Sequence, residues 1–86
     1  MLFIGGPMHG KPVPDELRSF INAHDEEIMP VKTIRLDDQG LSLVEAWEVY
    51  IKKPYWRLGK PMLYFYSYIG MDEDESIAQA REHLGL

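Results

Sequence analysis

The stretch MLYFYSYI, residues 62–69, decides the fold. Alternate positions along a strand face opposite sides of a sheet, so the stretch divides into two sets. One face carries Met62, Tyr64, Tyr66 and Tyr68, and the other carries Leu63, Phe65, Ser67 and Ile69. Because both sets are mainly apolar or aromatic, the sequence predicts a central strand that is covered on both faces.

The residues after this strand predict a C-terminal helix over about 73–84. Asp72 stands where an N-cap residue belongs, and Glu75 follows three positions later, as in a capping box. Gly85 stands where a glycine commonly ends a helix. The expected inward stripe of this helix is Ile77, Ala80, Arg81 and Leu84.

Short apolar runs, prolines and glycines predict the elements on either side. Expected are a strand at 2–4, a tight turn at 7–10, an extended or edge segment at 11–14, a strand at 30–36, and turns at 37–40 and 58–61. Residues 55–58 are expected to continue extended.

Residues 15–24 predict a further helix. Asp15 and Glu16 fall in its first turn, where the helix dipole favours acidic side chains. Leu17, Phe20 and Ile21 have the spacing of one buried helical face. The acidic run 25–27 would end this helix.

Residues 41–53 fit two structures. As a helix, Ser42 and Glu45 would form a capping box, and Pro54 would stop the run. As a strand, Trp47 and its alternate neighbours would face one side, and the β-branched and aromatic content favours this alternative. Periodicity alone does not decide between them. We favour a strand from about Trp47, with a helical turn allowed before it.

These elements predict one α+β domain spanning residues 1–86. Its core is a small, mostly antiparallel sheet of three to five strands with one or two covering helices.

Composition narrows the class of protein. The 86 residues contain no cysteine, which excludes disulfides, thiolate catalysis and cysteine zinc sites. No run approaches the roughly 20 apolar residues of a membrane span, so we expect a cytoplasmic protein without a membrane partner. The net charge of −5 disfavours binding to duplex nucleic acid.

The opening residues 3–10, FIGGPMHG, resemble those of small accessory proteins encoded by actinobacterial viruses, mycobacteriophages especially. Such proteins begin with a strand and a Gly-Gly-Pro-x-His/Asp-Gly turn. They commonly end with a basic aromatic hairpin that leads into an acidic-capped helix, as residues 50–57, 62–69 and 70–73 do here. The resemblance implies the bacterial host cytoplasm, a host protein as partner, and no catalytic residue.

No pattern in the sequence indicates catalysis. The serines and the histidines His9, His24 and His83 lack the motifs of a nucleophile–base pair or of a metal site. The glycine loop at 5–10 lacks the lysine and hydroxyl residue of a phosphate-binding loop. We therefore expect no enzyme activity, catalytic residue, metal or cofactor.

The candidate binding surface is the basic aromatic segment at 50–60. No acidic residue occurs between Val49 and Met71. The candidate residues are Lys52, Lys53, Tyr55, Trp56, Arg57 and Lys60. Tryptophan, tyrosine and arginine are enriched at protein-binding hot spots, and rings beside positive charges also suit single-stranded nucleic acid.

We expect a non-enzymatic protein that binds a host protein through this segment. Two alternatives stay open: a binder of single-stranded nucleic acid that uses the same residues, and a small homo-oligomeric structural protein, such as a homodimer. A third interpretation of the segment is that its rings fill the core.

Overall fold

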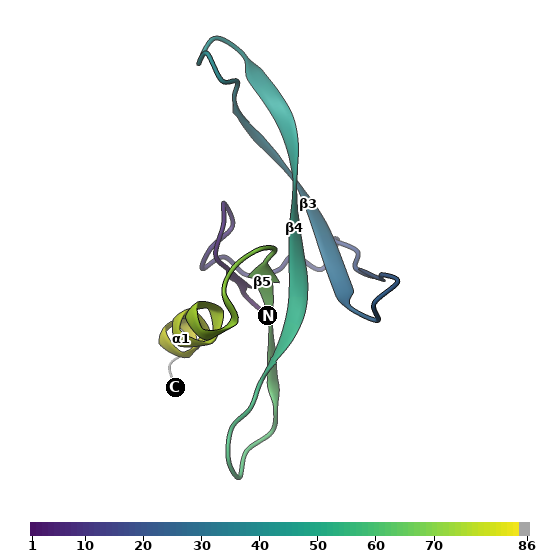
Figure 1. The fold of residues 1–86 in the computed structure, drawn as a ribbon, viewed down its shortest axis with the longest axis vertical. Coiled ribbons are helices and arrows are strands. Elements are labelled where there is room, and N and C mark those ends of the chain that lie inside the picture. Colours follow the sequence, from purple (N-terminus) through teal and green to yellow (C-terminus); the bar gives the residue numbers. More distant parts are fainter. Residues whose placement is uncertain (85–86) are drawn as a thin grey trace.

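The computed structural model describes residues 1–84, which form a five-stranded sheet with one helix. Figure 1 shows their arrangement. The elements are β1 (Phe3–Ile4), β2 (Phe20–Ile21), β3 (Glu27–Leu36), β4 (Leu43–Tyr55), β5 (Leu63–Tyr68) and α1 (Glu73–His83). The strand order is β1-β5-β4-β3-β2, in which β1 and β5 are parallel and the other pairs antiparallel. The predicted α+β class and mostly antiparallel sheet are confirmed.

β5 lies between β1 and β4, as its two apolar faces predicted. On one face, Tyr66 packs in a core cluster that we call the loop-side core. Its buried residues are Phe3, Met29, Val31, Tyr50 and Tyr66. On the other face, Phe65 packs in the helix-side core. Its buried residues are Ile4, Tyr55, Phe65 and Ala80. The single strand therefore joins the two halves of the hydrophobic core.

α1 begins where the capping pattern predicted. Asp72 is the N-cap, and its carboxylate accepts a hydrogen bond from the backbone N–H of Glu75 at 3.4 Å. Ile77 and Leu84 pack against the helix-side core, whereas Arg81 is exposed. The proposed terminating Gly85 lies outside the described residues.

The helix expected at 15–24 is wrong. Phe20 and Ile21 form β2, which pairs with β3, and Leu17 packs against the loop-side core. The chain then turns at Asn22, whose side-chain oxygen accepts from the backbone N–H groups of His24 and Glu26. A ten-residue helix is marginal in isolation, so strand pairing and Asn22 turn chemistry override the helical spacing.

Residues 43–55 form a strand along their whole length, which settles the ambiguity at 41–53. β4 pairs with β3 from Leu36↔Leu43 to Ile28↔Ile51. The carbonyl of Ser42 accepts from the backbone N–H of Asp37 at 2.9 Å and closes the 37–42 turn, so no capping box forms. The strand begins four residues before Trp47, and the helical turn allowed there is absent from this segment.

The predicted turns are present. Gly10 and Gly40 adopt positive φ values of 79° and 70° in the turns at 7–10 and 37–40. At 57–60, the backbone N–H of Lys60 donates to the carbonyl of Arg57 at 3.3 Å. The expected extension of residues 55–58 is wrong at Leu58, which lies within this turn, and β4 itself ends at Tyr55.

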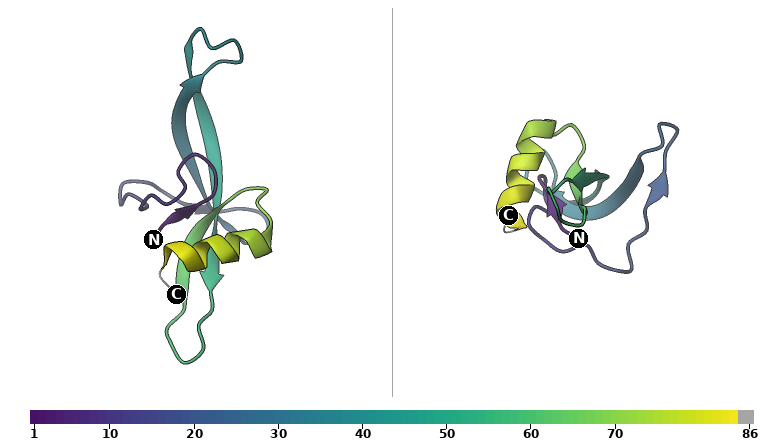
Figure 2. Two further views of the ribbon diagram at one scale, coloured as in Figure 1. Left: turned by 90° about the vertical axis from the view of Figure 1, so that its left-hand side faces the viewer. Right: turned by 90° about the horizontal axis from the view of Figure 1, so that it is seen from below.

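β3 and β4 run far beyond the rest of the sheet. We call residues 32–47 the arm. β5 pairs with β4 only over Tyr50–Tyr55, and β2 pairs with β3 only near its start. Figures 1 and 2 show the arm as a twisted two-stranded ribbon that leaves the body, with the turn between β4 and β5 at the opposite end and α1 beside the body. The molecule is accordingly elongated, with extents of 52 × 28 × 24 Å.

Candidate functional site

The fold separates the six candidate residues into packed and accessible groups. Tyr55 is buried in the helix-side core, and its hydroxyl accepts a hydrogen bond from Nε of Arg81 at 3.2 Å. It therefore fastens α1 to the end of β4. The core interpretation is correct for Tyr55, which is 8% exposed.

Lys52 is engaged within the sheet. Its Nζ lies 3.1 Å from Oε2 of Glu27 and 4.7 Å from the centroid of the Tyr64 ring. The hydroxyl of Tyr66 donates to the same carboxylate oxygen at 3.3 Å. Lys52 thus links β4 to β3 and β5 and contributes little free charge to a binding surface.

Because of this ion pair, the contribution of Glu27 to the stability of the fold depends on pH. Its hydrogen bond to Lys52 holds the pKa of Glu27 below its ordinary value of 4.5; burial acts in the opposite direction, and the charge of Lys52 with the hydroxyls of Ser19 and Tyr66 lowers the pKa further. A carboxyl whose pKa is lower in the folded state stabilises the fold above its unfolded pKa. That contribution disappears as the pH falls through the folded pKa.

We expect Glu27→Gln to flatten the acid limb of the stability curve. Between about pH 5 and pH 3, the wild-type free energy of unfolding should fall more steeply than that of the variant. Urea unfolding followed by circular dichroism at several pH values measures both slopes. Glu45→Gln is the control, because its pair with Lys32 is exposed and changes stability by less than about 0.5 kcal/mol. Parallel acid limbs for wild type and Glu27→Gln would contradict this role.

Arg57 organises the turn between β4 and β5. Its Nε and Nη2 both donate to the carbonyl of Pro61, at 3.2 and 2.8 Å. Gly59 provides the positive φ of 71° that the turn requires. Arg57 therefore acts as a brace that holds the turn.

Trp56 and Lys60 remain accessible, and Leu58 joins them. The side chain of Trp56 is 75% exposed and Leu58 is fully exposed, both on the same short turn. We call Trp56, Leu58 and Lys60 the tip. Lys53 is half-buried nearby on β4. Sequence reasoning missed Leu58, for which the only signal was an apolar residue next to the turn glycine Gly59.

A small hollow lies beside Trp56. It has a volume of about 130 Å³ and is lined by Pro54, Tyr55, Trp56, Ile77 and Arg81. The tip thus combines a projecting ring with a shallow apolar recess, which is a shape that suits a protein side chain.

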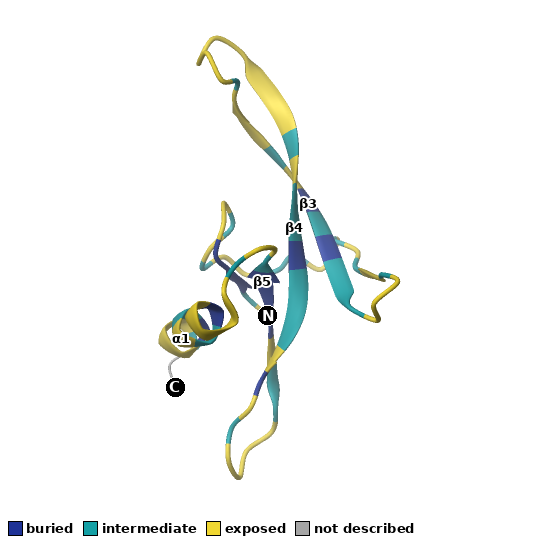
Figure 3. Cartoon of the chain, in the orientation of Figure 1, coloured by how far each residue is buried: buried dark blue, intermediate teal, exposed yellow. Residues whose placement is uncertain are grey.

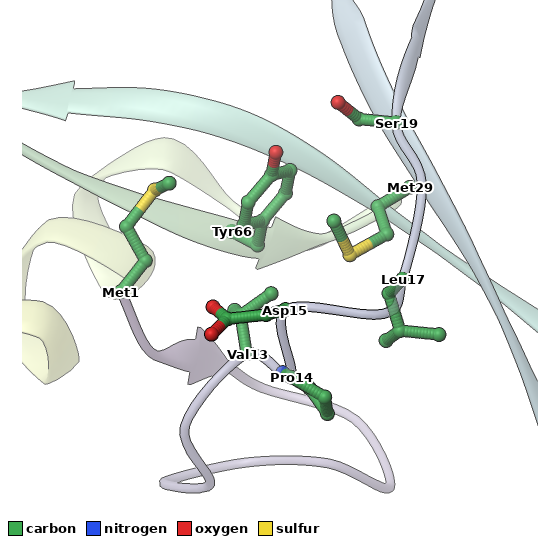
Figure 4. A pocket seen from close by; sticks show the side chains of 8 residues that line it. All are labelled: Met1, Val13, Pro14, Asp15, Leu17, Ser19, Met29 and Tyr66. Atoms are coloured by element: carbon green, nitrogen blue, oxygen red, sulfur yellow. The ribbon is translucent and has the colours of Figure 1, made fainter.

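A second hollow lies between the loop at 13–19 and the sheet (Figure 4). It has a volume of about 240 Å³ and is lined by Met1, Val13, Pro14, Asp15, Leu17, Ser19, Met29 and Tyr66. Asp15 is its one carboxylate, and the Tyr66 hydroxyl is directed to Glu27 instead. The lining offers no nucleophile–base pair. Within residues 1–84, no three His, Cys, Asp or Glu side chains gather in a way that would hold a metal ion.

Apolar side chains also stand exposed on one face of the arm, which sequence reasoning missed. We call Ile34, Leu36, Leu43 and Trp47 the arm stripe; each is between 59% and 73% exposed. They share a face because Leu36 pairs with Leu43, and Trp47 pairs with Lys32, two positions from Ile34. The alternation of the strand was visible in the sequence, but the absence of a covering layer on the arm was not.

No family model, curated protein or solved structure matches this chain. Over residues 1–84, no helix has the length and apolar character needed to cross a membrane.

Proposed function

We propose that this chain is a non-enzymatic, phage-type accessory protein that binds a host bacterial protein in the host cytoplasm. The observation that carries the proposal is the exposure of Trp56 and Leu58 on a turn braced by Arg57. The phage origin rests on the sequence resemblance of residues 3–10 and 50–73.

The tip has the features of a binding hot spot. A tryptophan supplies a large contact area, and hot spots are enriched in this residue. The brace between Arg57 and Pro61 fixes the turn before any partner arrives, so less conformational entropy is lost on binding. The expected recognition is insertion of Trp56 and Leu58 into an apolar recess of the partner.

Charge indicates what surrounds that recess. Lys60 is exposed at the tip and Lys53 is half-buried beside it, within a stretch, 49–71, that has no acidic residue. The chain as a whole carries −5. An acidic rim on the partner would therefore attract the tip and repel the rest of the molecule.

A protein partner is better supported than single-stranded nucleic acid. Tyr55 is buried, Lys52 is paired with Glu27, and Arg57 is bonded to Pro61. Three of the six residues that would stack on bases or contact phosphates are thus already buried or engaged in contacts within the protein. One ring and two lysines make a poor track for a nucleic-acid strand.

We expect Trp56→Ala to weaken partner binding at least about tenfold, as loss of a hot-spot side chain does. The partner is captured from an actinobacterial lysate with and without nuclease, purified, and titrated with each variant by calorimetry. Leu58→Ala should weaken binding in the same direction. Trp47→Ala is the matched control, because it removes the other exposed tryptophan, which lies on the arm and not at the tip, and it should leave the per-site affinity unchanged.

The outcomes separate the alternatives. Capture that vanishes with nuclease, together with affinity for an oligonucleotide that falls as salt rises, would move the function to nucleic acid. Equal affinities for wild type and Trp56→Ala, with both chains folded, would remove the tip as the binding surface.

A further inference from the structure

The arm lacks the packing that normally stabilises a sheet. Within residues 32–47 the two strands pair only with each other, and β2 and β5 pair with them below this segment. An isolated two-stranded hairpin is marginally stable in water and gains stability when its apolar face is covered. Figure 3 shows most of the arm coloured as exposed, in contrast to the sheet below it.

The uncovered face is mainly apolar, with one ion pair, Lys32–Glu45, among its apolar residues. From the far end it begins with the pair Leu36↔Leu43, continues through Ile34 and Trp47, and reaches the partly buried pair Pro30↔Val49. α1 covers the same side of the sheet only lower down, around Ile4 and Phe65. Soluble monomers seldom expose contiguous apolar patches of more than a few hundred Å².

We propose that the arm stripe binds the arm stripe of a second copy of this chain, face to face and antiparallel about a two-fold axis. The axis passes between the Ile34↔Glu45 and Lys32↔Trp47 pairs. Leu36 and Leu43 then lie over Pro30 and Val49 of the second copy. This contact is distinct from the tip and leaves both tips of the dimer free at its outer ends.

The charge on the stripe favours a second copy of this chain over a strongly acidic or strongly basic partner. The only ionised side chains among the arm-stripe pairs are Lys32 and Glu45, which lie 3.0 Å apart and cancel. A two-fold contact requires such self-complementarity, because the same surface of both copies forms the interface. Antiparallel stacking brings each Lys32 to the level of Glu45 in the second copy. The acidic start of α1, at 73–75, lies beside the body of the sheet and not on the arm (Figure 2).

The stripe would make a small contact. With Pro30 and Val49 it spans four cross-strand pairs on each copy, so the interface would lie at the small end of the specific class, whose lower limit is about 1,000 Å² of total buried surface. The dimer is therefore expected to be reversible and dependent on concentration.

Sedimentation velocity over a range of protein concentrations tests the proposal. Wild type is expected to shift from one chain mass to twice that mass as concentration rises. Trp47→Ala is expected to raise the dimer dissociation constant at least about tenfold. Trp56→Ala is the matched control and should leave this constant unchanged. In a Trp56→Phe chain, Trp47 is the only tryptophan, and its emission should shift to shorter wavelength as the dimer forms.

A charge exchange tests the geometry without touching the apolar residues. The Lys32→Glu chain presents two acids on each stripe, and the Glu45→Lys chain presents two bases, so each alone should stay monomeric. An equimolar mixture of the two should regain the dimer mass. Wild type that remains monomeric at every concentration would overturn the proposal, even if a lysate protein or a lipid vesicle occupied the stripe. Recovery of the dimer with Trp47→Ala at wild-type affinity would also overturn it.

Discussion

Replacing Gly6 with alanine is expected to lower the free energy of unfolding by about 3 kcal/mol, from backbone strain and overpacking together. Gly6 has a φ of +64°, a conformation that alanine rarely adopts. The added Cβ would lie 2.5 Å from Cδ1 of Tyr68 and 2.8 Å from the hydroxyl oxygen of Tyr50. Neither ring can yield easily, because Tyr68 donates to Glu48 at 2.6 Å and Tyr50 is bonded within the core.

Gly40→Ala separates the two causes. Gly40 has a similar φ of +70°, but nothing lies within 4 Å of an added Cβ. It should therefore cost only the backbone strain, about 1 kcal/mol. Chemical denaturation followed by circular dichroism gives both values, and the difference between the two variants reports the steric clash. Equal losses for Gly6→Ala and Gly40→Ala would show that the Gly6 contact does not constrain the fold.

Gly6 belongs to the glycine motif at 5–10 that carries the viral resemblance, and the backbone N–H groups of this motif make hydrogen bonds within the protein. The backbone N–H of Gly5 donates to Nδ1 of His9 at 2.7 Å, and that of Gly10 donates to the carbonyl of Phe3 at 2.8 Å. The N–H of Met8 donates to the Tyr50 hydroxyl. Donors that would approach a phosphate are thus directed inward. The motif builds the junction between β1 and the sheet, in agreement with the structural-turn interpretation of the sequence.

The elements that were predictable from sequence are those whose signals are local. β5 was readable because its alternation serves two real cores, and α1 because Asp72 caps it in the expected way. The segment at 15–24 was not, because its helical spacing competes with a pairing to β3 that no local pattern shows. A weak propensity loses to tertiary pairing of this kind.

The candidate binding surface was also predictable only where its signal is local. The composition of 50–60 identified a basic aromatic region, and Trp56 is accessible there. The engagement of Lys52 depends on Glu27, 25 positions earlier in the chain, and burial of Tyr55 depends on α1. Such contacts follow from the tertiary fold. From the sequence alone, these residues are therefore expected to be available for binding a partner.

Tyr50→Phe is expected to cost about 2–4 kcal/mol, because it leaves two backbone groups without a partner. The hydroxyl of Tyr50 donates to the carbonyl of Gly5 at 2.8 Å and accepts from the N–H of Met8 at 3.0 Å. Its ring is fully buried, 4.6 Å from that of Phe3, so phenylalanine fits the space but bonds to neither group. Urea unfolding at neutral pH measures the loss.

Tyr64→Phe is the matched control, because its ring is 43% exposed and lies outside both buried cores. It should change stability by less than about 0.5 kcal/mol.

Alkaline pH provides a second readout: burial raises the pKa of Tyr50, so wild-type stability is retained below pH 10 and falls as the pH rises through the folded pKa. Tyr50→Phe removes this part of the alkaline slope, while Tyr68, whose pKa is raised by its hydrogen bond to Glu48, keeps the remainder. A Tyr50→Phe chain as stable as Tyr64→Phe, with an unchanged alkaline slope, would mean that the glycine loop is held by packing alone.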